Sequence, residues 1–351
     1  MFFTKETLAA NRNVQGHWQN LWANRRVHDN YIASTFSIPA VNAQMVGNSA
    51  FATDFWKELD QMVVTSFKEV EGFEILQDLM PIETVVPIGK TVKDYPIRKG
   101  IANDVAVSVD GNAPYSKDHT GYDTDGDPSV IVTAGFGANW RHVAGLNTIG
   151  VDLILDSQQE KSRVYNEKLV DILLNGDDSV VVDGKACQGL KNHRNTKKIN
   201  LGASGANIDL ATATPTEVLE FYTKGAFYQN SLDNRIRVID VEWVSPQIWA
   251  NLQSDYVVNG VIKGPIWQEI VARGIVAEFR MTFALEGNET LGYVRQAQYL
   301  TVLNGMTTSI TPIPRQMPND NYNFQMMSAM GVQVKRDRDG LGKVVYCANF
   351  G

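Results

Sequence analysis

The chain has 351 residues, of which 44% are hydrophobic, and its formal net charge is −7. This length and composition allow a sizeable core in two medium domains, or in one domain with large insertions, and they exclude global disorder. The negative charge argues against a dedicated nucleic-acid binder, although a mildly acidic protein can still enclose DNA. Because the sequence has neither a signal peptide nor a run of ~20 apolar residues, we expect a soluble protein made in the cytosol. Its two cysteines, Cys187 and Cys347, indicate free thiols in a reducing compartment.

The first 50 residues are rich in Asn, Gln, Ala and aromatic side chains, and they show little charge and little periodicity. Aromatic residues such as Trp18 and Trp22 expose too much apolar surface for a disordered tail. We predict an extended arm that buries these side chains on a neighbouring chain. The alternative is that the segment packs on its own domain.

A projecting loop is predicted in the next part of the chain. A helix is expected from Thr53 to about Val70, where apolar residues recur on one face, and residues 73–89 are interpreted as an apolar connector with strand character. Strands are predicted over 91–99 and 129–142, as the two arms of one antiparallel excursion. The polar tract between them, from Asp104 to Pro128, has few apolar residues to hold it on its own body. We therefore predict a β-loop that docks on another subunit.

Apolar residues recur at spacings of three and four from Val151 to Leu174, which predicts one long helix. At ~1.5 Å per residue this helix would be roughly 36 Å long. Residues 147–148 can cap its start, and Asn175-Gly176 can end it with a left-handed turn. Gln158 and Ser162 interrupt the apolar stripe, so we expect a surface strut that is clamped only at its ends.

A second compact region begins at Thr214, after a loop-like stretch. Thr214-Pro215-Thr216-Glu217 combines a capping hydroxyl, a proline in the first turn and the glutamate of a capping box, which predicts a helix that runs toward Gln229. Short strands and helices follow as far as the chain end. There, two strands flank a polar turn, and the charged run 335–339 is interpreted as the solvated tip of a hairpin. The pattern as a whole indicates an α+β fold.

No motif in the sequence carries enzyme chemistry or a metal site. Asp123–Asp127 has the start of a calcium loop, but Pro128 and Ala134 stand where that loop needs Gly and Glu, so we interpret it as an acidic loop tip. Gly184-Lys185 lacks the rest of a phosphate loop. No histidine has a partner at ligand spacing or lies in a nucleophile motif; the five are His17, His28, His119, His142 and His193. We therefore predict no catalytic, cofactor-binding or metal-binding residues.

The order of these parts resembles that of the major capsid proteins of tailed bacteriophages, which have the Hong Kong 97 type fold shared with encapsulins. The start of that family's projecting E-loop resembles the segment LMPIETVVPIGKTVKDYPIRKGIANDVAVSVDG. The return from the loop and the spine helix resemble GANWRHVAGLNTIGVDLILDSQQEKSRVYNEKLVDILLNGD, and the short segment after that helix resembles ACQGLKN. The strand-helix step of the family's A-domain resembles IRVIDVEWVSPQIWANLQ. The resemblance covers most of the chain.

The resemblance implies an α+β capsid fold with six parts. These are an N-terminal arm (1–50), the start of the peripheral domain (51–87), an E-loop (88–138), the peripheral domain with the spine helix (139–199), an axial A-domain (200–310) and the C-terminal strands of the peripheral domain (311–351). It also implies a major capsid protein, found in the virion and assembled in the host cytoplasm, whose hexamers and pentamers form an icosahedral head around double-stranded DNA.

The partners implied by the resemblance are other copies of the chain, a portal and cement proteins, with no membrane and no cofactor. Some family members carry a long N-terminal scaffolding segment that is missing here. Since Met1 is present, we expect a separate scaffolding protein.

Nine residues are candidates for assembly contacts. They are Trp18 and Trp22 of the arm, Lys93, Arg98 and Lys99 of the E-loop, and Glu160, Arg163, Glu167 and Lys168 of the spine helix. Glu160 and Arg163 form a favourable i,i+3 pair within the helix, and across a subunit contact such charges would set specificity. Two other interpretations stay open: an encapsulin-type compartment, and a soluble hydrolase or sugar-binding protein.

Overall fold

The computed structural model describes residues 70–101, 105, 107, 109–110, 119–147, 152–258 and 260–350. All of them belong to one compact unit, Lys68–Gly351. The predicted N-terminal arm, with Trp18 and Trp22, and the predicted helix that begins at Thr53 lie outside the described residues, apart from Val70 at the end of that helix.

A five-stranded sheet organises the second half of the chain, with the strand order β11-β8-β12-β15-β7. Its strands are β7 (Lys197–Asn200), β8 (Ile239–Val244), β11 (Val276–Met281), β12 (Thr290–Tyr293) and β15 (Val344–Ala348). β12 lies between β8 and β15 and runs antiparallel to both, whereas the outer pairs β11–β8 and β15–β7 are parallel.

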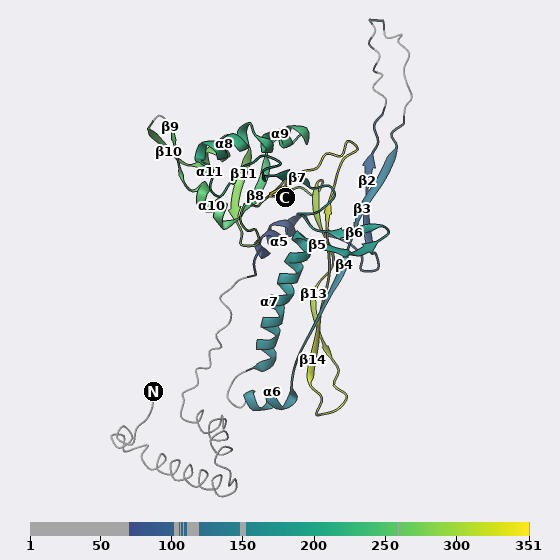
Figure 1. Cartoon of the computed structure of the whole chain (residues 1–351). Helices are drawn as coiled ribbons and strands as arrows, with labels where there is room; N and C mark the ends of the chain where they lie inside the picture. Colours follow the sequence, from purple (N-terminus) through teal and green to yellow (C-terminus); the bar gives the residue numbers. More distant parts are fainter. Residues whose placement is uncertain are drawn as a thin grey trace, which may run out of the picture. The chain divides into compact units, whose positions relative to one another are not determined.

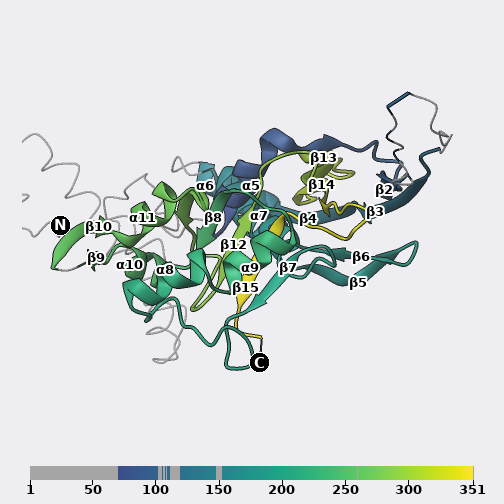
Figure 2. The same ribbon diagram turned by 90° about the horizontal axis from the view of Figure 1, so that it is seen from above.

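Four helices gather around this sheet in both Figure 1 and Figure 2. They are α8 (Pro215–Thr223), α9 (Ala226–Asp233), α10 (Pro246–Leu252) and α11 (Ile266–Ala272). Each helix contributes buried side chains to one apolar core that it shares with β8, β11 and β15, among them Tyr222, Phe227, Ile248 and Ile266. The capping box predicted at Thr214 is present and starts α8.

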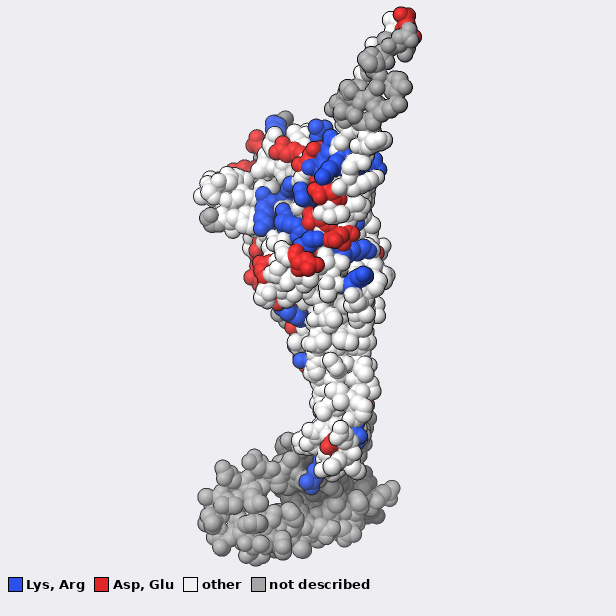
Figure 3. Space-filling model, turned by 90° about the vertical axis from the view of Figure 1, so that its right-hand side faces the viewer, with Lys and Arg blue, Asp and Glu red and all other residues white. Residues whose placement is uncertain are grey.

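A four-stranded sheet of the order β1-β13-β14-β4 forms the other large element. Its strands are β1 (Thr84–Val85), β4 (Val130–Ala138), β13 (Leu300–Ile313) and β14 (Tyr322–Val334). None of their residues is Asp, Glu, Lys or Arg. Figure 3 shows the consequence on one face, where charged side chains crowd the upper part and the part below is nearly free of them.

The long helix α7 (Leu153–Leu174) packs on this sheet. The hydroxyl of Tyr165 donates a hydrogen bond to the carbonyl oxygen of Val132 at 2.9 Å and lies 2.7 Å from Oγ of Ser328. These two contacts join the helix to β4 and β14, since Val132 and Ser328 are opposite each other in the ladder between those strands.

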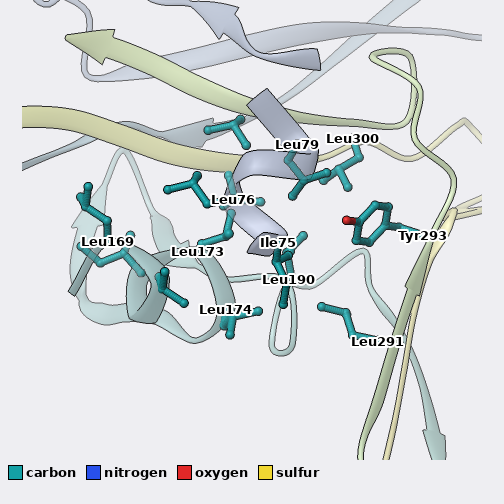
Figure 4. Close-up of a cluster of buried hydrophobic side chains, with 14 of the residues drawn as sticks. Ile75, Leu76, Leu79, Leu169, Leu173, Leu174, Leu190, Leu291, Tyr293 and Leu300 are labelled. Carbon is teal, nitrogen blue, oxygen red and sulfur yellow. The ribbon is translucent and has the colours of Figure 1, made fainter. Parts of the chain in front are cut away.

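The main apolar core forms where α5 (Phe73–Leu79) meets the end of α7. Figure 4 shows side chains from both helices, from the loop after β6 and from β12 pointing toward one another. Six of them have no exposed surface: Ile75, Leu79, Leu173, Leu190, Leu291 and Tyr293. Full burial of such a side chain contributes roughly 1.5–3 kcal/mol, so this core anchors one end of α7.

Three two-stranded ribbons complete the fold. They are β2 (Val92–Arg98) with β3 (Tyr122–Pro128), β5 (Gly176–Val182) with β6 (Lys185–Gln188), and β9 (Asp255–Val258) with β10 (Val261–Pro265). The predicted pairing of strand 91–99 with strand 129–142 is wrong, because β2 pairs with β3 and β4 pairs with β14. β3 was not predicted because its residues are mostly polar and lack the apolar alternation typical of a strand.

The predicted spine helix is confirmed, but its ends differ in detail. It begins at Leu153, and its cap is Asp152, whose carboxylate accepts hydrogen bonds from the N–H groups of Ile154 and Leu155, rather than a residue of 147–148. Gly176 supplies the left-handed stop with φ of 73°. All the buried residues of the helix lie from Tyr165 onward, so within the described residues only its C-terminal half is clamped.

Three other predicted elements are wrong in part. The connector 73–89 opens with the helix α5, because a short apolar run fits a helix and a strand equally well by periodicity. The strand 129–142 ends at Ala138, and the helix α6 (Trp140–Asn147) follows it. The helix expected from Thr214 to Gln229 is divided into α8 and α9 at Gly225, where a Cβ atom would lie 2.8 Å from Cα of Phe221.

The chain end also departs from the expected hairpin. β14 and β15 flank the charged run 335–339, but they lie in different sheets. β14 pairs instead with β13, and β15 pairs with β12 and β7. The run is therefore a link between the two sheets. The expected domain boundary at 310 falls inside β13.

Candidate assembly surfaces

A partly buried polar cluster holds the base of the β2–β3 ribbon. We call it the E-loop root, and it consists of Tyr95, Asp125, Asp127, His193, Arg194 and Arg336. Asp127 is 2% exposed, and its Oδ1 atom lies 3.0 Å from Nε2 of His193 and 2.8 Å from Nη2 of Arg194. Since charged groups are rarely buried unless they are paired, these two contacts fix where the ribbon leaves the body of the protein.

Asp125 extends the E-loop root toward the chain end. It accepts hydrogen bonds from Arg194 at 2.9 Å and from the N–H of Gly126 at 2.8 Å, and Arg336 lies 3.4 Å away. Burial opposes ionisation of Asp125, but the Gly126 N–H and the charge of Arg194 outweigh it, so that its pKa lies below the usual value. The predicted acidic loop tip at Asp123–Asp127 is therefore wrong for its inner residues, which are partnered inside the protein.

Tyr95 completes the root from the β2 side. Its hydroxyl donates to Asp125 at 3.3 Å and accepts from the N–H of Arg336 at 3.1 Å, and burial raises its pKa to about 12. Next to it, Asp94 pairs with Lys185 at 2.5 Å, which ties β6 to β2. The ribbon is thus held by three separate chain segments.

The charges of the spine helix form two groups. Nη2 of Arg163 lies 2.6 Å from Oε1 of Glu160, as expected, and Arg163 also contacts Glu167. The hydrogen bond from Arg163 lowers the pKa of Glu160. Lys168 does not join them but pairs with Asp171 at 2.7 Å.

The three E-loop candidates lie at the base of the loop. Lys93 is in β2, with Nζ 3.4 Å from the carbonyl oxygen of Val85. Arg98 is the last residue of β2, and Lys99 follows it; both are exposed. No hydrogen bond or ion pair joins them to the charges of α7 within the described residues, so the two sets mark separate surfaces.

Exposed apolar side chains mark two further surfaces. Val105, Val107 and Val109 of the E-loop are 84%, 93% and 103% exposed. On the β9–β10 ribbon, Val261 and Ile262 are 59% and 64% exposed. Grouped exposed apolar residues of this kind are typical of protein–protein interaction sites.

Within the described ranges, no group of three or more His, Cys, Asp or Glu residues is arranged to hold a metal ion. No helix in the same ranges is long and apolar enough to cross a membrane.

The arrangement of sheets, spine helix and ribbons defines a class: the chain has the Hong Kong 97 type fold of phage capsid proteins. It is similar to the capsid of Myoviridae Phage XM1, with a TM-score of 0.61 and 13% identity over 85% of this chain and 98% of that one. It is also similar to the capsid of the native GTA particle, with a TM-score of 0.55 and 11% identity over 86% and 97%. A third similar structure, from Microbacterium phage Oxtober96, has a TM-score of 0.55 and 9% identity over 85% and 98%.

By sequence, the chain belongs to a family of unknown function, DUF6260, which matches residues 42–347. No curated protein matches it. The α+β fold class and the resemblance to tailed-phage capsid proteins, both expected from the sequence, are confirmed at the level of the fold.

The E-loop root was not predicted. Asp127 and His193 are 66 residues apart, and Asp125 and Arg336 are 211 residues apart. Only β3 brings the acidic residues to their partners, and β3 itself was interpreted as a loop. The one available signal was the alternation of Asp123, Asp125 and Asp127, which places all three on one face of a strand.

Proposed function

We propose that the chain is the major capsid protein of a tailed phage, assembled in the host cytoplasm. Copies would form hexamers and pentamers of an icosahedral head that encloses double-stranded DNA. The observation that carries the proposal is the similarity to the capsid of Myoviridae Phage XM1, which extends over 98% of that chain with a TM-score of 0.61.

The surfaces of the single subunit support assembly with other copies. The three E-loop valines at positions 105, 107 and 109 are almost fully exposed, which is unfavourable for a subunit that stays alone in water. The E-loop root holds the base of the same loop in place. A loop with a fixed base and an apolar free part is suited to docking on a neighbour.

Enclosure of DNA, rather than binding to it, is consistent with the charges. The net charge is −7, and the strands of the four-stranded sheet carry no basic residue. Such a surface releases few counterions from the phosphate backbone, so it gains little affinity for DNA. A separate scaffolding protein, a portal and cement proteins are the proposed partners, along with other copies of the chain.

Negative-stain electron microscopy of the full-length protein tests the proposal. Closed shells or capsomers are expected, and particles purified from cells that express the gene in its native setting should contain nuclease-protected DNA. Closed shells that hold protein cargo and no protected DNA would favour an encapsulin-type compartment instead. A monomer or dimer in size-exclusion chromatography at every concentration would contradict a shell function altogether.

A further inference from the structure

A cleft with a volume of about 760 Å³ lies beside the E-loop root and is lined by an excess of positive charge. Six of its lining residues are basic: Arg98, Arg235, Lys335, Arg336, Arg338 and Lys343. They come from the end of β2, the α9–β8 loop and the link between β14 and β15. The net charge of the chain is −7, so six basic side chains around one cleft are a local excess of positive charge.

Few of these cations are neutralised from inside the protein. Asp337 is the one carboxylate in the described lining, and its Oδ1 accepts the N–H groups of Asp339 and Leu341 at 3.0 and 2.8 Å. Arg336 is held by Asp125, and Arg338 lies 3.3 Å from Asp339. The other four cations have no carboxylate partner among the described residues.

These four cations fall into two kinds. Lys335 donates to the carbonyl oxygen of Ala297 at 2.7 Å, and Lys343 donates to those of Asn234 and Arg235 at 2.6 and 2.7 Å. The side chains of Arg98 and Arg235 make no hydrogen bond or ion pair to the described part of the chain, and both are exposed. The lysines are therefore built into the walls, and the two guanidinium groups are free to bind a ligand.

The surroundings of the cleft disfavour the charged form of its two lysines. Burial and the charge of Lys93 lower the pKa of Lys335, and burial lowers that of Lys343 against the opposing charge of Asp337. An anion in the cleft would relieve this cost. Guanidinium groups bind carboxylate and phosphate through two parallel hydrogen bonds, so either anion satisfies the chemistry.

The form of the cleft and its aromatic residues favour carboxylate over nucleic acid. Duplex DNA is too wide to enter a hollow of this volume, and single strands are held largely by stacking on free aromatic rings. Tyr95 is buried with its hydroxyl bonded on both sides, and the ring of Tyr299 is already covered by Lys343 at 5.8 Å. An extended polypeptide with Asp and Glu side chains is narrower than duplex DNA and needs no free aromatic ring, so it fits the cleft.

We propose that this basic cleft binds an acidic segment of a partner polypeptide, with Arg98 and Arg235 as the residues that grip its carboxylates. The site goes beyond the proposed shell function, because the binding needs one subunit and no assembled particle. Since Arg98 ends β2, an occupied cleft would also hold the E-loop from its other side.

Fluorescence anisotropy with a labelled oligo-aspartate peptide tests the proposal on the soluble full-length protein. A Gly-Ser peptide of equal length is the ligand control. The double variant Arg98→Gln with Arg235→Gln removes both free guanidinium groups and no internal contact. The double variant Arg141→Gln with Arg237→Gln removes the same charge from exposed positions outside the cleft lining. Circular dichroism verifies that both variants are folded.

The acidic peptide should bind, and its affinity should fall by about tenfold or more in the cleft variant, since two charge-assisted contacts are lost. The control variant should change the affinity by no more than about twofold through long-range charge. Equal binding of the Gly-Ser peptide, equal loss in both variants or no binding at all would overturn the proposal. Tighter binding of a single-stranded oligonucleotide, lost in the cleft variant, would overturn it in favour of nucleic acid.

Discussion

Nε2 of His193 lies 3.0 Å from Oδ1 of Asp127, and both side chains are buried. The histidine follows β6, and the aspartate stands near the end of β3, so this contact joins the projecting ribbon to the segment that comes after the spine helix. The base of the E-loop is therefore stabilised by contacts within one chain and does not depend on a neighbouring copy.

Replacing Asp127 should destabilise this base. Asp127→Ala leaves His193 and Arg194 without their shared partner, and we expect the free energy of unfolding to fall by about 2–4 kcal/mol, in the range for broken buried polar networks. Urea unfolding followed by tryptophan fluorescence measures it. Asp123→Ala, on the same strand but exposed, is the control, with an expected loss below about 0.5 kcal/mol. Equal losses of stability in the two variants would contradict the claim that the buried contacts of Asp127 stabilise the E-loop base.

Alanine substitutions at two glycines with the same φ should distinguish two destabilising effects: the strain of a left-handed backbone and the steric clash of an added Cβ atom. Gly176 and Gly184 both have φ of 73°, but a Cβ atom at Gly176 would overlap the carbonyl oxygen of Cys187, and one at Gly184 would meet nothing. Gly184→Ala should cost about 1–2 kcal/mol of stability. Gly176→Ala should cost more, because the stop of α7 must move away from β6. Thermal unfolding of both variants checks the order, and a smaller loss for Gly176→Ala would contradict it.

The buried Glu242 should make the stability of the subunit depend on pH. The hydroxyl of Tyr222 donates to it at 2.7 Å, Thr290 and Cys347 are the other polar groups near it, and its Oε2 atom has no hydrogen-bond partner among the described residues. Burial raises its pKa from 4.5 to about 7. Between these two values the folded protein keeps a proton that the unfolded chain loses, so stability falls as pH rises through this window.

Glu242→Gln tests this dependence because the amide does not ionise. The variant should gain stability relative to the parent as pH rises from about 4.5 to about 7, by a total on the order of 3 kcal/mol at about 1.4 kcal/mol per pKa unit. Urea unfolding at a series of pH values gives the difference. Glu220→Gln, at an exposed position of α8, should give a flat difference. A flat difference for Glu242→Gln as well would show that its burial does not govern the pH response.

The charges around Arg163 should matter for assembly rather than for folding. Arg163→Glu places a third carboxylate between Glu160 and Glu167 and removes both ion pairs. If these charges face a neighbouring subunit, the assembled fraction in sedimentation velocity should drop while the circular dichroism spectrum stays unchanged. Lys161→Glu changes the net charge equally without breaking an ion pair of the described chain. Equal assembly of the two variants would argue against this surface as a contact.

The E-loop valines should contribute to the particle and not to the subunit. The triple variant Val105→Ser, Val107→Ser and Val109→Ser should fold normally, because these side chains are almost fully exposed. Burial of a valine on a neighbour is worth roughly 1.5–3 kcal/mol, most of which serine forfeits, so the particles should dissociate at lower temperature or denaturant concentration. Val85→Ser, at another exposed valine, is the control. Unchanged particle stability would mean that the valines stay in water after assembly.

The sequence by itself determined the elements whose signals are local. The spacing of apolar residues gave the spine helix within two residues of its start, and Thr214 with Glu217 gave the capping box that begins α8. The pair Glu160–Arg163 was also predictable, since residues three apart on a helix are neighbours. The order of these elements was enough to indicate the capsid fold.

Only the tertiary structure decided which strands pair and which charges meet. β4 pairs with β14 rather than with the strand before the E-loop, and β15 enters the other sheet, because strand pairing depends on contacts between residues far apart in the chain. For the same reason Asp125 and Asp127 were interpreted as part of an acidic loop tip, and His193 as a histidine without a partner. An aspartate in the sequence can lie in a solvated loop or in a buried cluster. Burial distinguishes these two environments, and it is set only when the chain folds.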